Sequence, residues 1–268
     1  MTGQKTTIRR VDRVYRGKTT HHYEDLDRAR VPGVTNLIGD GFPKPALINW
    51  AGNATADYAV NNWDSLSEKG PADRVKELRG ARFADRDKAA RRGTEIHKLG
   101  EQLVRGEEVT VPDELAGHVE AYVRWLDTFA PDPVLIEAVV YSERFRYAGT
   151  LDLVADLPCL LPDCPNDRDR WLLDLKSNRS GVYGETALQL AAYRYADFYV
   201  DHDGLAQRMP DVAHCGVVWV RGDGADLVPV EATEATFMDF RYVARVARLA
   251  GRINNNVGEA LTIEGAVA

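Results

Sequence analysis

Residues 149–157, GTLDLVADL, and residues 171–177, WLLDLKS, decide the fold of this chain. Both are short runs rich in leucine, of a length typical of β-strands, and each carries one aspartate between two leucines, Asp152 and Asp174. Side chains at positions i and i+2 of a strand face the same way. We therefore expect Asp174 and Lys176 to project together while the leucines beside them face the core.

The two aspartates become a candidate cation site if these strands pair as a hairpin through the loop at 158–170, because Asp152 and Asp174 then lie side by side. Two adjacent carboxylates repel each other unless a proton or a cation lies between them. A hard divalent cation such as Mg²⁺ accepts oxygen ligands and keeps waters that a phosphate can displace. An Asp-x-Lys triplet alone is weak, since an ion pair on an edge strand has the same pattern. Gly149 allows a close backbone approach that aims Asp152.

The remaining pattern predicts an α/β fold, a central mixed β-sheet flanked by helices, with a helical N-terminal subdomain. We expect three divisions: a mostly helical elaboration over 1–83, a core over 84–258 and a flexible tail over 259–268. The expected elements are a hairpin at 7–30, helices at 46–62, 72–105, 114–129, 185–200 and 233–254, and strands at 134–145, 149–157, 171–177, 213–220 and 225–231.

Charge is unevenly distributed along the chain. The formal net charge is -7, yet residues 73–92 hold eight basic and four acidic side chains. A cationic segment binds a nucleic-acid backbone whatever the net charge, and we expect DNA contacts from its arginines, including Arg86, Arg91 and Arg92. A solvated helical face with mixed charges explains the same pattern equally well.

Localisation and cysteine usage point to the cytoplasm, the host cytoplasm if the chain is phage-encoded. No apolar run approaches the roughly 20 residues that cross a bilayer, and the N-terminal MTGQKTTIRR lacks the apolar stretch of a secretory signal. We therefore expect no membrane partner. Cys159, Cys164 and Cys215 are odd in number and lack zinc-ribbon spacing, so free thiols are expected.

Two helices add polar groups. In GTEIHKLGEQL, His97 and Glu101 lie one turn apart on one face, and an imidazole near carboxylates is a candidate metal ligand, although a lone helical histidine is more often structural. In LQLAAYRYA, Gln189 and Tyr193 form a similar pair, which could also simply rim the core.

In order, these segments resemble the PD-(D/E)xK nuclease superfamily, in particular its RecB-like branch with phage exonucleases and CRISPR-associated adaptation nucleases. The resemblance covers roughly residues 90–200. Val34-Thr35 and the segment 43–50 are less specifically similar to actinobacterial phage members. The motifs that carry it are Gly93-Thr94-x-x-His97, Glu137, Gly149-Thr150-x-Asp152, Asp174-x-Lys176 and Gln189-x-x-x-Tyr193.

The resemblance implies a restriction-endonuclease-like core and a role for each motif. His97, Asp152, Asp174 and the carbonyl of Leu175 would bind one or two Mg²⁺ or Mn²⁺ ions. Lys176 would orient or activate the attacking water. Gln189 and Tyr193 would contact DNA or support the site. Glu137 would be the acidic catalytic residue of the core, with Glu143 and Glu101 as alternatives for that role.

The chain departs from the family in two ways. The loop between Asp152 and Asp174 is longer than usual, and only Cys215 follows the core where many RecB-like relatives carry iron–sulfur cysteines, so no cluster is expected.

The expected function is a metal-dependent DNA exonuclease of phage or bacterial recombination, repair or replication. The alternatives are a non-cleaving module that binds DNA ends and a hydrolase of small phosphoesters.

Overall fold

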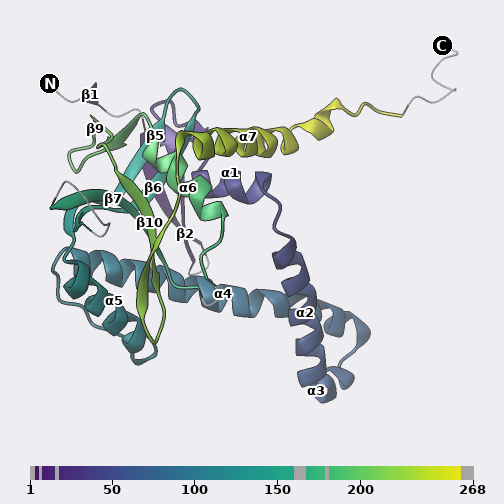
Figure 1. The fold of residues 1–268 in the computed structure, drawn as a ribbon. Coiled ribbons are helices and arrows are strands. Elements are labelled where there is room, and N and C mark those ends of the chain that lie inside the picture. The colour runs from purple at the N-terminus through teal and green to yellow at the C-terminus, as the bar shows by residue number, and fades with distance from the viewer. Residues whose placement is uncertain (1–3, 6–7, 16–17, 160–166, 179–180, 261–268) are drawn as a thin grey trace, which may run out of the picture.

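The centre of the molecule is an eight-stranded mixed sheet in the order β1-β9-β8-β5-β6-β7-β10-β11 (Figure 1). The computed structural model describes residues 4–5, 8–15, 18–159, 167–178 and 181–260. Only β7 and β10 pair in parallel, and every other neighbouring pair is antiparallel. The strands are β1 (Gln4–Lys5), β5 (Asp132–Ser142), β6 (Tyr147–Pro158), β7 (Arg168–Lys176), β8 (Phe198–Val200), β9 (Leu205–Arg208), β10 (His214–Val220) and β11 (Ala225–Pro229).

Helices cover both faces of this sheet, which confirms the predicted fold class. One face packs against α4 (Pro71–Val104) and α5 (Ala116–Phe129), through a core that includes Ile96, Trp125 and Leu173. The other face packs against α1 (Val34–Gly41), α6 (Glu185–Arg194) and α7 (Glu234–Ala250), around Phe240 and Leu172. The sheet therefore has no open face at its centre, and a polar site there must lie between buried layers.

The N-terminal part adds a small sheet and a helical projection. Strands β2 (Ile8–Tyr15), β3 (Lys18–Asp25) and β4 (Arg30–Val31) form a three-stranded antiparallel sheet, which confirms the predicted hairpin. Helices α2 (Pro45–Asn61) and α3 (Trp63–Ser67) stand away from the sheet beside the first half of α4 (Figure 1). Helix α4 runs without a break through Gly80 and Gly93, and the predicted boundary at 83–84 falls inside it.

The helix predicted over 185–200 ends earlier than expected. Helix α6 ends at Arg194, and the backbone N–H of Asp197 bonds to the carbonyl of Tyr141 at 3.0 Å. The next residues, 198–200, pair with β5 as strand β8. The prediction was wrong here because residues 198–200 are too few to show a strand period, and only their pairing with β5 separates them from the helix.

At the C-terminal end, Thr233 caps α7 as predicted, since its side chain accepts a hydrogen bond from the N–H of Thr236. Short 3-10 helices lie at Asp113–Leu115 and Ile253–Asn256. Among the described residues, no helix is both long enough and apolar enough to traverse a bilayer.

Candidate metal centre

The site forms where β6 and β7 part. Their antiparallel pairing, predicted as a hairpin, ends at Leu153 and Leu173, one step before the position that would set Asp152 against Asp174. Strand β7 continues to Lys176 paired only with β10. The gap is bridged by Asp152, whose Oδ2 accepts a hydrogen bond from the N–H of Leu175 at 2.7 Å.

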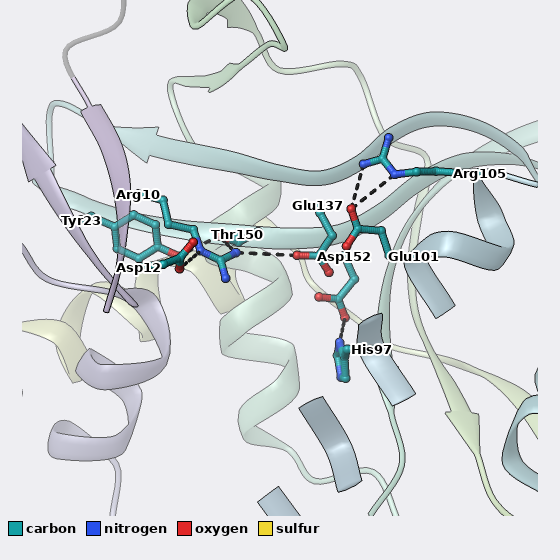
Figure 2. Close-up of polar contacts among 9 residues, drawn as sticks. All are labelled: Arg10, Asp12, Tyr23, His97, Glu101, Arg105, Glu137, Thr150 and Asp152. Atoms are coloured by element: carbon teal, nitrogen blue, oxygen red, sulfur yellow. Dashed lines mark hydrogen bonds and ion pairs between the residues drawn. The ribbon is translucent and has the colours of Figure 1, made fainter. Parts of the chain in front are cut away.

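Three ligand atoms converge at this gap. One donor atom each of His97, Glu137 and Asp152 lies within 4.8 Å of the other two, and the imidazole Nδ1 is 3.5 Å from Asp152 Oδ2. Figure 2 shows them pointing toward one another from α4, β5 and β6. Among the described residues no other group of this kind forms, so Asp174, although it lines the same cavity, is not within this distance of the three.

Glu137 and Asp152 stand opposite each other in the β5–β6 register, at a point where the backbone of β5 is irregular. Glu137 has a left-handed backbone with φ of 49° in the middle of β5, a conformation that costs energy for a residue with a side chain. Consecutive residues Ile136 and Glu137 therefore line the same cavity, as do Asp152 and Leu153 opposite them. Regular alternation would have turned one of each pair to the other face.

The electrostatics of the cluster favour a cation. Burial raises the pKa of Glu137 to about 8, and the nearby charges of Asp152 and Glu101 add to that rise. Glu101 also lines the cavity and pairs with Arg105 at 3.0 Å. Carboxylates held this close in a buried place repel each other, and a bound cation relieves the repulsion. The donor set of one imidazole and two carboxylates suits Mn²⁺ and Mg²⁺.

Asp174 and Lys176 lie on the α6 side of the sheet, where they project together as predicted. Asp174 is 2% exposed, and its Oδ2 is 2.7 Å from the Lys176 ammonium. Burial raises the pKa of Asp174, an effect that Lys176 partly offsets. Burial lowers the pKa of Lys176, but Asp174 and Asp152 outweigh it, and the net shift is upward. The lysine therefore stays charged.

The pair Gln189 and Tyr193 stands behind Asp174. Gln189 Nε2 donates to Asp174 Oδ1 at 2.7 Å and lies 3.5 Å from the Tyr193 hydroxyl. Tyr193 is 4% exposed, and its ring fills the space that a side chain on Gly149 would need. This placement fits the supporting role expected for the pair and leaves Tyr193 little surface for DNA.

Sequence reasoning missed Arg10. It comes from β2, and its Nη1 lies 3.8 Å from Glu137 Oε2 and 3.4 Å from Thr150 Oγ1, as drawn in Figure 2. Tyr23, on the neighbouring strand, shares a 2.8 Å hydrogen bond with the same threonine. No local pattern signals this contact, because Arg10 and Glu137 are far apart in the sequence. Glu143, an alternative for the role of Glu137, lies exposed in the turn after β5.

The other predicted residues are distributed as follows. The carbonyl of Leu175 points to the gap, because the N–H and C=O of one strand residue face the same neighbouring strand and its N–H bonds Asp152. Arg91 is exposed on α4, and Arg92 is half-buried with a solvent-shielded Nε that has no hydrogen-bond acceptor among the described residues. The side chain of Arg86 lies outside the described part of the structure.

The cysteines correct one expectation. Cys159 is disulfide-bonded, so the prediction of a free thiol is wrong there, and Cys164 lies outside the described residues. Cys215 is free and buried, as expected, and burial raises the pKa of its thiol to about 11. The sequence around Cys159 did not reveal the bond, because a disulfide depends on which segments the fold brings together.

In comparisons with known proteins, neither a model of a protein family nor a curated protein matches the chain.

Proposed function

We propose that this chain is a divalent-metal-dependent deoxyribonuclease that hydrolyses phosphodiester bonds at the gap between β6 and β7. The observation that carries the proposal is the convergence of His97, Glu137 and Asp152 within 4.8 Å, beside a lysine that remains charged. Burial raises the pKa of Glu137 to about 8, which shows that this half-buried place disfavours a second negative charge unless a cation is present. A metal-assisted hydrolase needs such a set.

The residues present fit a small divalent ion. His97, Glu137 and Asp152 would hold it, with the Leu175 carbonyl directed to the same gap. The cavity that they line has room for about 20 Å³, enough for a single ion or water and far below the volume of a small-molecule pocket. When bound, such an ion lowers the pKa of a coordinated water and neutralises charge on the attacked phosphate.

The remaining polar groups have positioning roles. Lys176 presents a positive charge beside the reacting phosphate, and Asp174 fixes the direction of that lysine. Gln189 in turn fixes Asp174 from α6. Arg10 places a second cation next to Glu137, 33% exposed and so open to a phosphate that approaches from solvent. A preorganised charge of this kind costs no rearrangement during the reaction.

DNA would reach the site along α4. Eighteen residues make five helical turns, so Arg79 lies on the same stripe of α4 as His97, about 27 Å along the axis. Arg79 and Arg82 are both exposed in the half of the helix that stands away from the sheet (Figure 1). Contacts from such residues to phosphates bind DNA without regard to sequence.

The test is cleavage of end-labelled linear DNA and of closed circular DNA, each with Mg²⁺, Mn²⁺ or EDTA. We expect metal-dependent loss of the linear substrate with little loss of the circle, as for an exonuclease. Asp152→Asn removes one ligand charge without changing shape and should abolish product. Asp156→Asn, four residues along the same strand and outside the cavity, is the matched control and should cleave normally.

Three results separate this proposal from its alternatives. Cleavage by Asp152→Asn at the wild-type rate would overturn the metal centre. Retention of labelled DNA by wild type without product under any metal would support a non-cleaving module that binds DNA ends. Hydrolysis of a small chromogenic phosphodiester, with DNA left intact, would support a small-substrate hydrolase.

A further inference from the structure

Helix α7 exposes an apolar stripe on the side that faces away from the protein. Its buried stripe, which packs on the sheet, consists of Phe237, Phe240, Ala244 and Ala247. At about 100° per residue, a second stripe lies on the opposite side. This outward stripe consists of Met238 (37% exposed), Tyr242 (65%), Val246 (51%) and Leu249 (40%), and Ile253 (44%) continues it past the helix end.

Arginines line one flank of the outward stripe. Arg241, Arg245 and Arg248 follow one another at spacings of four and three residues, which keeps them on one helical stripe, and Arg252 follows just past the end of α7. These four residues are called the arginine stripe. No ion pair joins any of them to a carboxylate of the described residues. The arginine stripe borders a cavity of about 380 Å³ between α7 and the β5–β6 turn.

Two of these arginines are fixed by the protein itself. Arg248 Nη2 donates to the carbonyls of Phe145 and Arg146 at 3.0 and 3.1 Å. The guanidinium of Arg241 lies over the Phe145 ring, 4.1 Å from its centroid. Fixed guanidinium groups without acidic partners, next to exposed apolar side chains, form a preorganised surface for an apolar and acidic ligand.

The shape of this surface favours a helix as its occupant. The apolar face of a helical partner can pack on side chains spaced three and four residues apart, and the outward stripe supplies this spacing over about four turns. Single-stranded DNA fits less well, because bases stack on aromatic rings and only Tyr242 in the stripe is aromatic. An anionic membrane would contact both flanks of the helix, whereas the other flank carries Asp239 and no arginine.

A second copy of the chain also fits poorly. If two α7 helices pair antiparallel about a two-fold axis, each arginine stripe meets the arginine stripe of the other copy, and like charges repel. In a parallel pair, each arginine stripe meets the opposite flank of the other helix, where Asp239 is the one carboxylate. Self-association through α7 therefore leaves the arginine stripe without carboxylate partners, and a different protein that supplies the negative charge fits this surface better.

We propose that α7 is the docking site for an acidic amphipathic helix of a partner protein. The apolar face of that helix covers the outward stripe, and its aspartates or glutamates along one edge pair with the arginine stripe. Figure 1 places α7 across the sheet from α4, so the docked helix leaves the metal centre accessible. The proposal does not depend on the nuclease function.

The test uses a synthetic helical peptide with leucine at every a and d position and glutamate along one edge, labelled for fluorescence anisotropy. We expect wild type to bind it with a dissociation constant in the micromolar range. R245E/R252E changes the two arginines for which no internal contact is described and should weaken binding at least tenfold. R124E/R208E, two exposed arginines elsewhere, is the matched control and should bind as wild type.

A charge exchange makes the result specific. A second peptide with lysine in place of every glutamate should bind wild type weakly and R245E/R252E at least tenfold better. Adding V246S/L249S should weaken binding of the glutamate peptide to wild type and binding of the lysine peptide to R245E/R252E. Failure of the glutamate peptide to bind, or equal binding of the two peptides, would overturn the proposal, as would tighter arginine-dependent binding of oligo-dT or of phosphatidylserine vesicles. Metal-dependent DNA cleavage by R245E/R252E, measured separately, tests the nuclease proposal independently.

Discussion

Helix α4 is one continuous helix with two different halves. In the sheet half, residues 93–104, Ile96 and Leu99 are 3% and 4% exposed and pack against the sheet. In the projecting half, residues 71–92, the large apolar side chains Val75 and Phe83 are 47% and 38% exposed. The sheet half carries His97 into the candidate metal centre, while the projecting half carries most of the basic residues of α4.

Under the proposed function, this difference would let one rigid element serve two physical tasks. A metal ligand has to be held to a fraction of an ångström, which requires packed neighbours that fix its side chain. A cation that meets a DNA backbone has to stay hydrated and reachable, which requires exposure. Because the helix is unbroken, the buried half fixes the direction of the exposed half. We therefore expect substitutions in the sheet half to affect chemistry and those in the projecting half to affect binding.

The largest effect is expected at the site that the sheet half supports. Lys176→Ala removes the charge beside the phosphate and should lower kcat by about 100-fold to 1,000-fold, as loss of one preorganised charge does. It also leaves Asp174 buried without its cation, which should cost about 1–3 kcal/mol of folding stability. Single-turnover cleavage and thermal unfolding measure the two effects separately, and an unchanged kcat in folded protein would contradict the role of Lys176.

His97→Ala tests the sheet half itself. Loss of one ligand should lower cleavage at limiting Mn²⁺ by about 10-fold to 100-fold, because two carboxylates alone hold the ion more weakly. Raising the Mn²⁺ concentration should restore part of the rate, whereas it should not rescue Lys176→Ala. Titration of the rate against Mn²⁺ distinguishes the two variants, and identical curves for His97→Ala and wild type would remove the histidine from the ligand set.

The strands of the site were predictable because their signals are local. Runs of leucine and β-branched residues marked β5, β6 and β7, and the two-residue period placed Asp174 and Lys176 on one face. The helical period placed His97 away from the core side of α4. These patterns need only neighbours in the sequence, and the fold class followed from their order.

The rest of the site depends on contacts between distant segments. The residues next to Glu137 in the sequence do not predict its left-handed backbone, because that conformation depends on the strands paired with β5. Arg10 reaches that carboxylate from a hairpin that no local pattern connects to the sheet. Strand β8 was read as helix because three residues, Phe198–Val200, are too few to show a period. Tertiary pairing decides all three.

Substitutions in the projecting half of α4 should change DNA affinity and leave the cleavage rate unchanged. The double variant Arg79→Ala/Arg82→Ala removes two exposed charges and should weaken DNA affinity about tenfold at 0.1 M salt. The slope of log affinity against log salt should fall by about 1 for each arginine that contacts a phosphate. Cleavage at saturating DNA should be unchanged. A loss of kcat with normal affinity would mean that the two halves of α4 do not divide these tasks.

The smallest effect compares one substitution in both halves. A methyl group on Gly80, in the projecting half, meets no atom within 4 Å, so Gly80→Ala should stabilise the protein by about 0.5–1 kcal/mol through helix propensity. A methyl group on Gly100, in the sheet half, would lie 2.9 Å from Leu175 Cδ2 and 3.4 Å from Tyr122. There the crowding should outweigh the same gain and leave Gly100→Ala about 1 kcal/mol less stable than wild type.

Cleavage should also fall for Gly100→Ala, because Leu175 holds Asp152 through its N–H, and should stay normal for Gly80→Ala. Urea unfolding of both variants supplies the comparison, and equal stabilisation at the two positions would show that the sheet half is packed no more tightly than the projecting half.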